Sequence, residues 1–506
     1  MRKSSILCGV SLLSTVVVSC GDKKIPEHPN IIYILADDLG YGDVSAYFPQ
    51  GKITTTHIDR LASEGMRFTD AHAPSGVSTP TRYGILTGSY CWRSQLKTGV
   101  LQGYGRSLIA HDKHTVASLL KEHGYATAVI GKWHLGLDWQ LKDDRQLSVD
   151  KLEARYKTGD FIINLPSEMI DFSKPPLNGP TSHGFDYSYI LPASLDMEPY
   201  CYLRNDTLTT PLNGYTEGND LNTGATGAFW RAGRMAEDFD FMDVLPNFTR
   251  QAVQYIRKSA EKKQPFFLYF PMPAPHTPWL PTAEFEGKSG AGDYGDFVTM
   301  TDDMVGQLLK AVKEAGIEEN TIIILTSDNG PYWQSRMIAK YDHRAAGNFR
   351  GMKSDAWDGG HRIPFIVKWP GHIEAGSVSN ALTVLTNLMA TVAEIAGVDA
   401  NQLPGDDSHS ILPVLLGQTS DVPNQKAIVQ HSGRGHFAIR TGEWKLIQGK
   451  GSGGFSTTPA EEALMIEDGQ LYNMNDDPSE TINLFANRKD VVQDLSILLE
   501  EIKKQK

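Results

Sequence analysis

The sequence has few cysteines, fewer basic than acidic residues, and no long apolar run beyond its N-terminus. Four cysteines in 506 residues exclude a small fold held together by disulfide bonds. Two of them, Cys91 and Cys201, lie in the body of the chain, and the sequence does not decide whether they pair. With 48 Lys and Arg against 60 Asp and Glu, the formal net charge is −12. We therefore expect no nucleic-acid partner, and an anionic substrate would require positive charge to be concentrated locally.

The overall amino-acid composition is that of a globular protein. Hydrophobic residues make up 40% of the chain and charged residues 21%, which excludes a disordered or fibrous protein. A length of 506 residues allows two to four domains, or one large α/β domain with a small one beside it.

The N-terminus has the pattern of an export signal. A basic start precedes an apolar stretch at residues 6–18, which is too short to span a membrane comfortably. The stretch ends in Val17-Val18-Ser19-Cys20, which resembles a bacterial lipobox, where the cysteine receives lipid; an ordinary signal peptide with a chance cysteine is the alternative. We predict a signal peptide at 1–19, lipidation of Cys20, a tether at 20–28, and an exported lipoprotein anchored to a membrane, in the periplasm or at the cell surface.

Four apolar runs end directly in polar residues, at 31–35, 126–130, 266–270 and 322–325. Continuous apolar runs of this length are typical of strands buried on both faces of a parallel sheet. Helix-like segments lie between them, at 115–121 and 302–314, so the pattern predicts an open, doubly wound α/β sheet. In such sheets ligands bind beyond the carboxyl ends of the strands, and we expect a functional site where the polar residues gather.

The last hundred residues predict a different, smaller unit. A helix is expected at 382–395, and a final helix at 491–502. Short strands are expected at 427–429, 436–440 and 443–447, followed by a glycine-rich loop or turn at 449–454. We therefore place the main domain at 29–400 and a small α+β subdomain, an antiparallel sheet with a helix packed on it, at 401–506.

One motif carries a candidate nucleophile. Ser78 and Thr79 before Pro80 predict the start of a helix, where free backbone N–H groups and the helix dipole favour an anion. Arg82 follows four residues after Ser78 and lies on the same face of the first turn. A serine beside a guanidinium suits attack on a tetrahedral oxyanion; a capping serine with a surface arginine is the alternative.

The motifs together resemble the type I sulfatase family of the alkaline phosphatase superfamily. Ser78-Thr79-Pro80-Thr81-Arg82 is similar to its signature, whose first residue, Cys or Ser, is oxidised to formylglycine. Further similar motifs follow in the family's order at 30–43, 131–136, 275–278, 326–330 and 350–364. The resemblance runs through nearly the whole chain from residue 29. It implies a large mixed, mainly parallel sheet flanked by helices, with a small C-terminal α+β subdomain.

The resemblance also implies the groups of the site. The metal ligands it implies are Asp37, Asp38, Asp328 and Asn329. Their oxygen-only donors favour one Ca²⁺ ion. The catalytic residues it implies are Ser78, Arg82, Lys132, His134, His276 and Lys353.

In the implied reaction, one hydroxyl of hydrated formylglycine at position 78 attacks sulfur, and His276 protonates the leaving alcohol. His134 then takes a proton from the second hydroxyl, and sulfate is expelled. An unmodified serine lacks that second hydroxyl. We therefore expect Ser78 to be a precursor, matured by an anaerobic-type formylglycine-generating enzyme.

The expected substrate is a sulfated glycan or saccharide. The segment 190–200 is similar to one in bacterial sulfatases that act on carbohydrates. Asp358, His361 and Arg362 are expected to contact the sugar; a turn in which a buried arginine holds the loop is the alternative. The leading expectation is a 6-O-sulfate on galactose or N-acetylgalactosamine of host glycans. A phosphatase, phosphodiesterase or phosphonate hydrolase on the same fold, and a non-catalytic lipoprotein that binds sulfated glycans, are the competing functions.

Overall fold

The computed structural model describes the chain apart from residues 1–27, 143–163, 224–225, 400–401, 403–404 and 506. The predicted signal peptide, Cys20 and the tether up to residue 27 lie outside the described residues. Within the part that is described, no helix combines the length and the apolarity needed to cross a membrane.

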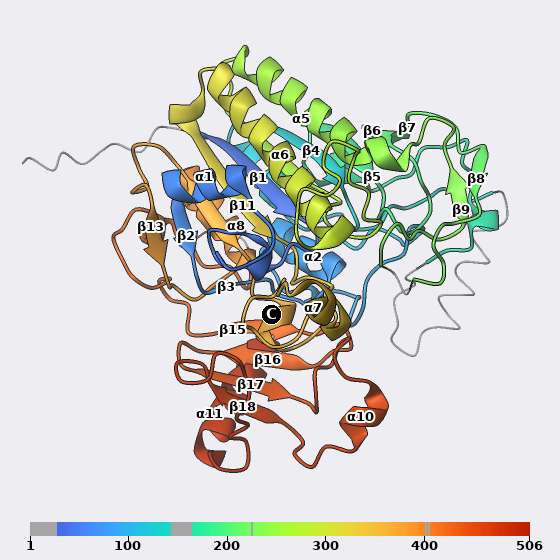
Figure 1. The fold of residues 1–506 in the computed structure, drawn as a ribbon. Coiled ribbons are helices and arrows are strands. Elements are labelled where there is room, and N and C mark those ends of the chain that lie inside the picture. Colours follow the sequence, from blue (N-terminus) through green and yellow to red (C-terminus); the bar gives the residue numbers. More distant parts are fainter. Residues whose placement is uncertain (1–27, 143–163, 224–225, 400–401, 403–404, 506) are drawn as a thin grey trace, which may run out of the picture.

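A ten-stranded mixed sheet runs through the larger part of the molecule (Figure 1). At its centre, β1 (Asn30–Ala36) is parallel to β10 (Phe266–Pro271) on one side and to β11 (Thr321–Ser327) on the other, and β4 (Ala126–Lys132) lies beside β10. These are the four strands expected from the apolar runs. Nearly every residue in them is buried, which is why the runs show no polar alternation. Their carboxyl ends meet at one edge of the sheet.

Shorter strands extend this sheet and form two small ribbons. On one side lie β12 (Phe365–Lys368), β2 (Met66–Phe68) and β13 (Ser377–Ser379), and on the other β5 (Tyr187–Leu191), β6 (Leu203–Arg204) and β7 (Thr207–Leu208). The ribbons pair β3 (Ala71–His72) with β14 (Thr383–Val384), and β8 (Gly214–Thr216) with β9 (Gly233–Met235).

Two groups of helices cover the faces of the sheet (Figure 1). One group consists of α1 (Thr56–Glu64), α5 (Val244–Ala260) and α6 (Gly292–Glu314). The other consists of α2 (Ser78–Thr87), α3 (Val116–Glu122), α8 (Leu388–Ile395) and α9 (Leu412–Leu415). A short helix, α7 (Ser335–Tyr341), lies in the long connection after β11.

Two helices begin elsewhere than the sequence predicts. Helix α6 starts ten residues before the predicted 302, because Tyr294, Phe297 and Val298 extend its buried face although two glycines lower the local helix propensity. The helix expected from 382 starts only at Leu388, because residues 383–384 form β14 instead. Helix α9, on the C-terminal side of the predicted boundary at 401, packs into the core of the larger part.

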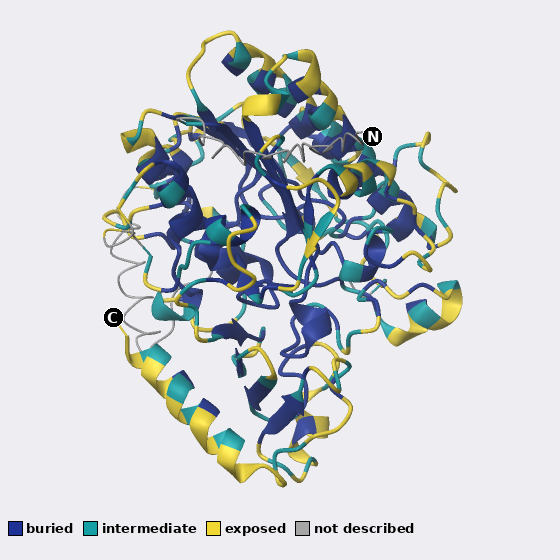
Figure 2. Cartoon of the chain, turned by 90° about the vertical axis from the view of Figure 1, so that its left-hand side faces the viewer, coloured by how far each residue is buried: buried dark blue, intermediate teal, exposed yellow. Residues whose placement is uncertain are grey.

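The C-terminal unit is the predicted antiparallel sheet with a helix packed on it. Its strands are β15 (Ile428–His431), β16 (Phe437–Arg440), β17 (Trp444–Gln448) and β18 (Gln470–Asn473), with α10 (Pro459–Ala463) between the last two. Helix α11 (Lys489–Lys504) buries Leu495 and Leu499 and leaves its outer face exposed (Figure 2). Strand β18 is the one member of this sheet that the apolar pattern does not predict. In the larger part, Cys91 and Cys201 are both free and buried.

Candidate active site

Residues from distant parts of the chain converge at the carboxyl edge of the central strands. Asp37 and Asp38 follow β1, and Asp328 and Asn329 follow β11, which pairs with β1 in parallel register. Lys132 ends β4. Because these strands are adjacent, their side chains meet in one place, as the sequence pattern predicts.

Ser78 is the first residue of α2 and is buried at this meeting point. Its Oγ donates to Asp37 Oδ1 at 3.3 Å, and Lys132 Nζ donates to Asp37 Oδ2 at 2.5 Å. Arg82, one turn further along α2, donates to Asp328 Oδ2 at 2.8 Å and lies 3.6 Å from Asp37. The motif therefore forms the first turn of a buried helix whose serine and arginine both face the carboxylates, and the surface-arginine alternative is wrong.

The second carboxylate of the pair, Asp38, faces another set of partners. It accepts from Lys353 Nζ at 2.9 Å and from Asn329 Nδ2 at 2.6 Å, and His276 Nε2 lies 3.8 Å away. Asp38 has a φ of +65°, in the left-handed region that non-glycine residues rarely occupy. Its N–H donates to Asp328 Oδ1 at 3.2 Å, which helps to hold this strained turn in place.

Three carboxylates and three cations share this small volume. Burial by itself raises the pKa of Asp37, but neighbouring positive charges, led by Lys132, hold it well below its usual range. The pKa of Asp328 is raised, first by burial and then by the charge of Asp37. These opposite shifts show that the two buried carboxylates interact strongly with each other and with the cations around them.

The oxygen donors fit a hard metal ion. Within the described part of the chain, Asn329 Oδ1 is buried with no hydrogen-bond partner, while its amide nitrogen donates to Asp38 and to the carbonyl of Gly330. An orphaned carbonyl oxygen among carboxylates is the donor chemistry that Ca²⁺ prefers. A nitrogen of His276 also lies within 4.8 Å of oxygens from Asp37 and Asp38, but imidazole suits Zn²⁺ or Cu²⁺ better than Ca²⁺.

The two histidines have different hydrogen-bond partners. His134 Nε2 lies 2.9 Å from the carbonyl oxygen of Leu101, which can only accept, so the proton of a neutral ring sits on Nε2. Burial first, then Lys132 and Arg82, keep the pKa of His134 well below its usual range. Its Nδ1, buried without a partner, therefore carries a free lone pair. His276 donates from Nδ1 to the carbonyl of Thr277 at 2.6 Å, which leaves Nε2 on the side of Asp38.

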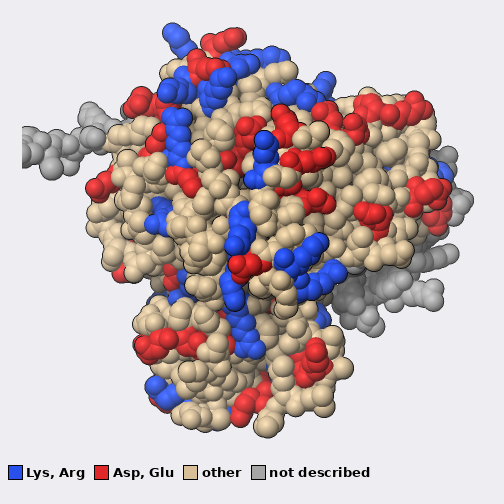
Figure 3. Space-filling view, viewed as in Figure 1, with Lys and Arg blue, Asp and Glu red and all other residues tan. Residues whose placement is uncertain are grey.

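A cavity of about 220 Å³ opens over these groups. Ser78, His134, His276 and Lys353 line its inner part. The other lining residues that matter below are Ser194, Asp196, Arg231, Tyr332 and Phe455. On the face seen in Figure 3, Lys and Arg side chains gather down the middle of the molecule, although the protein as a whole is acidic.

Sequence reasoning missed this outer wall. Ser194, whose Oγ accepts from Lys132 at 3.1 Å, and Asp196 lie in the segment 190–200, whose resemblance marks the segment without assigning a residue. No pattern in the sequence indicates Arg231 or Phe455, because they reach the cavity from connections remote from every motif. Phe455 follows the glycine-rich stretch predicted as a loop.

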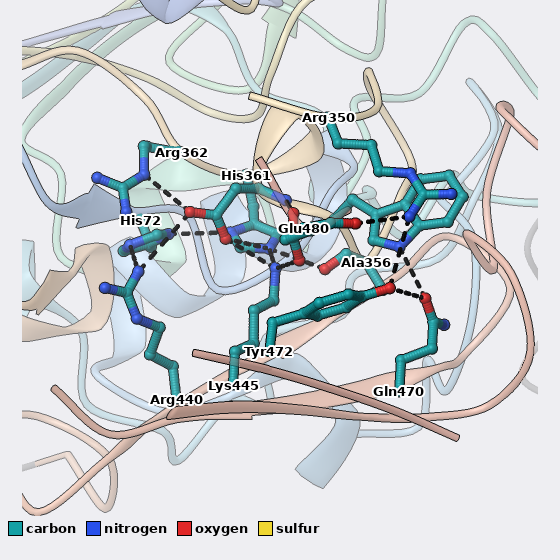
Figure 4. Close-up of polar contacts among 12 residues, drawn as sticks. His72, Arg350, Ala356, His361, Arg362, Arg440, Lys445, Gln470, Tyr472 and Glu480 are labelled. Carbon is teal, nitrogen blue, oxygen red and sulfur yellow. Dashed lines mark hydrogen bonds and ion pairs between the residues drawn. The ribbon is translucent and has the colours of Figure 1, made fainter. Parts of the chain in front are cut away.

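The expected sugar contacts of Asp358, His361 and Arg362 are not seen. All three side chains are buried and none lines the cavity. His361 and Arg362 lie beside Arg440 and Lys445 of the C-terminal sheet (Figure 4). Asp358 Oδ1 accepts from Lys445 Nζ at 2.7 Å and its Oδ2 from Arg362 Nε at 2.8 Å. The turn directs these side chains toward cationic partners on β16 and β17. The alternative of a turn held by a buried arginine is therefore the correct one.

This second cluster is balanced in charge. Its three carboxylates, Asp70, Asp358 and Glu480, are matched by three cations, Arg362, Arg440 and Lys445. His72, Asp358 and His361 are close enough to hold a metal ion, but Lys445 Nζ already lies 3.2 Å from His361 Nε2. Burial lowers the pKa of His72 to about 4, so it adds no charge at neutral pH. The cluster is an ion network that joins the two parts.

Comparison with known proteins places this geometry in a family. A model of the family described as Sulfatase matches residues 29–398, and one described as N-sulphoglucosamine sulphohydrolase, C-terminal, matches residues 353–505. The N-acetylgalactosamine-6-O-sulfatase of Bacteroides thetaiotaomicron is 33% identical, over 99% of each chain.

Solved structures agree with the family models. One from work on glycosaminoglycan metabolism by B. thetaiotaomicron has a TM-score of 0.78 at 32% identity and covers 94% of this chain and 99% of its own. Another, a complex with its substrate D-glucosamine-2-N,6-O-disulfate, has a TM-score of 0.61 at 21% identity, covers 94% of this chain and 98% of its own, and shows the shared fold.

The sheet topology, with polar and charged groups gathered at the carboxyl edge of its central strands, is that of the alkaline phosphatase-like fold. Within that class the chain belongs to the type I sulfatase family, and it is a sulfatase.

Proposed function

We propose that this sulfatase removes a 6-O-sulfate from galactose or N-acetylgalactosamine in a sulfated glycan, using formylglycine formed from Ser78 and one bound Ca²⁺. The observation that carries the proposal is the position of Ser78 Oγ, 3.3 Å from Asp37 at the floor of a cavity lined by Lys353 and two histidines. The sugar is suggested by a relative named N-acetylgalactosamine-6-O-sulfatase that matches the chain from end to end.

The charged groups would bind the sulfate. Lys353 reaches the cavity with its Nζ on Asp38, and Lys132 and Arg82 lie beneath it against Asp37 and Asp328. Fixed cations in a buried site stabilise negative charge that develops in the transition state. Asp37, Asp38, Asp328 and Asn329 would hold the metal, which when bound polarises a sulfate oxygen and neutralises charge.

The histidines would move the protons. His276 lines the cavity with Nε2 near Asp38, and as an imidazolium, protonated on both ring nitrogens, it would give its Nε2 proton to the leaving sugar oxygen. His134 Nδ1, with its free lone pair, is placed to remove a proton from the group at position 78. Formylglycine at that position supplies, when hydrated, a second hydroxyl that allows sulfate to be released.

Export and maturation belong to the same proposal. We propose that the chain is a lipoprotein attached to a membrane through Cys20, in the periplasm or at the cell surface, where sulfated glycans are accessible. An anaerobic-type formylglycine-generating enzyme would act on Ser78, since that residue is serine and not cysteine.

The first expected result concerns the sulfate position. The protein purified from its native host should release sulfate from 6-sulfated N-acetylgalactosamine or galactose at least about 100-fold faster, in kcat/KM, than from the 4-sulfated or gluco-configured isomers. Sulfate released from defined saccharides is measured by ion chromatography. The absence of release from every 6-sulfated galacto-configured sugar would overturn the substrate assignment. An aryl phosphate hydrolysed faster than the matching aryl sulfate would favour the phosphatase alternative.

The second expected result concerns maturation. The tryptic peptide that contains Ser78, from the native host, should be lighter by two hydrogen atoms than the encoded serine peptide, because the alcohol has been oxidised to an aldehyde. Mass spectrometry measures this, and the same peptide from a host without the maturation enzyme is the control. Full activity in protein that carries only unmodified serine contradicts the proposal.

A further inference from the structure

The outer wall of the cavity is connected directly to its reacting floor. A turn runs from Ser194 to Met197, closed by a hydrogen bond from the N–H of Met197 to the carbonyl of Ser194 at 3.3 Å. Ser194 Oγ is fixed by Lys132, and Leu195 is buried in the core. Asp196 therefore lines the cavity from a rigid turn that also contacts a sulfate-binding lysine.

Only one of the two carboxylate oxygens of Asp196 accepts a hydrogen bond from the described residues. Arg231 Nη1 donates to its Oδ2 at 2.5 Å and to its carbonyl oxygen at 3.0 Å. Its Oδ1 is buried and has no hydrogen-bond partner among the residues that the structure describes. Burial raises the pKa of this carboxyl, but His276 and Arg231 outweigh burial and lower the pKa to about 2. A buried, ionised oxygen without a donor is unfavourable, so the site is completed by a ligand that donates a hydrogen bond.

Arg231 adds donors at the same place. Its main-chain N–H bonds to the carbonyl of Asp196 at 3.2 Å, and its guanidinium lies over the ring of Phe229 at 5.0 Å. The side chain is half exposed at the cavity. A carboxylate acceptor beside guanidinium donors matches two neighbouring hydroxyl groups on a sugar ring.

An apolar surface lies in the same cavity. Phe455 is 55% exposed, and its ring meets that of Tyr332 edge-on at 5.6 Å. The loop that carries it is fixed by Ser456, whose N–H donates to Asp355 at 3.1 Å. An exposed aromatic ring suits the C–H face of a sugar better than it suits water.

We infer that Asp196, held in place by Arg231, binds hydroxyl groups of the sulfated sugar ring and is a specificity-determining residue. This inference rests on the proposed function as a glycan sulfatase. It assigns recognition of the sugar to the turn after β5, and not to the buried residues near 358–362.

The test is Asp196→Asn, which keeps the size of the side chain and removes its charge. The ratio of kcat/KM on 6-sulfated N-acetylgalactosamine to that on 4-nitrophenyl sulfate should fall about 100-fold, because only the sugar offers hydroxyl donors to Asp196. With 3-deoxy and 4-deoxy analogues of the sulfated sugar, one analogue should be cleaved equally by the wild-type and variant enzymes. An equal loss on the sugar and the aryl ester, or an equal penalty on every deoxy analogue, overturns the inference.

Asp206→Asn is the matched control. Asp206 is also a buried aspartate with an unpartnered Oδ1, but it lies between β6 and β7 and accepts from Thr181, outside the cavity. Its variant should leave the ratio unchanged, and an equal fall there would show that Asp196→Asn acts only through packing. If the matured wild-type enzyme cleaves the aryl sulfate but Asp196→Asn changes nothing, the inference fails while the sulfatase function stands. If the wild type cleaves the aryl sulfate but releases no sulfate from any sugar, the proposed substrate is wrong, and the inference that rests on it is wrong as well.

Discussion

Ser78→Ala is expected to lower the kcat for sulfate release by at least about 10⁴-fold in protein from the native host. Alanine has no side-chain oxygen and cannot be converted to formylglycine, so residue 78 loses its proposed nucleophile, while the Asp37–Lys132 pair and the buried helix α2 remain. Nucleophiles that form covalent intermediates typically give losses of this size when they are removed. Sulfate release is measured on the sulfated sugar and on an aryl sulfate.

The wild-type protein with unmodified Ser78 tests whether the serine hydroxyl alone is sufficient for repeated turnover. Unmodified Ser78 protein should complete at most one turnover, because its hydroxyl can form a sulfate ester but offers no second hydroxyl for release. The product is a peptide heavier by one SO₃ group, seen by mass spectrometry. Ser188→Ala, which removes a buried hydroxyl on β5 outside the cavity, is the control and should keep its turnover. Repeated turnover by the unmodified serine protein contradicts this account.

Lys445→Met is expected to lower the free energy of unfolding by about 3–5 kcal/mol. Lys445 is fully buried, and its Nζ lies 2.7 Å from Asp358 and 2.7 Å from Glu480. Methionine fills the same space without charge, so Glu480 loses the cation it pairs with and Asp358 loses one of its three, in a medium of low dielectric. Urea denaturation of the whole chain, followed by fluorescence, measures the change.

Lys121→Met is the matched control for burial. Lys121 pairs with Asp186 at the same 2.7 Å, but both side chains are about half exposed. Such a pair contributes no more than about 1 kcal/mol, so this variant should be nearly as stable as the wild type. The double change Lys445→Met with Glu480→Gln should recover part of the loss, because one uncompensated charge is removed. Equal effects of Lys445→Met and Lys121→Met would show that the buried network does not join the two parts.

The position of this network explains why its role was misread from the sequence. Asp358, His361 and Arg362 stand close to Lys353 in the chain, and charged residues close to a lysine proposed to bind sulfate suggest sugar contacts. The chain reverses at Asp358–Gly360 and turns the side chains toward β16 and β17, where Arg440 and Lys445 compensate the buried carboxylate. That compensation depends on residues about eighty positions later, which no local pattern reports.

The gathering of the motif residues at one edge of the sheet, in contrast, was predictable. Its residues stand at the ends of apolar strands, and parallel strands bring their carboxyl ends together. Ser78 and Arg82 are related by one helical turn, which is local geometry. The outer wall was not predictable, because Asp196, Arg231 and Phe455 meet only through loops of irregular length.

The sequence by itself determined the class of the fold, the convergence of the motif residues and the family, because buried strands and helix starts depend on short-range patterns of polarity. The tertiary structure alone decided which charged residues open onto the cavity and which join the two parts. The physical reason is desolvation. A buried charge must be compensated, and whether a ligand or another side chain compensates it depends on partners from distant segments of the chain. Tertiary packing determines those partners, and sequence spacing does not.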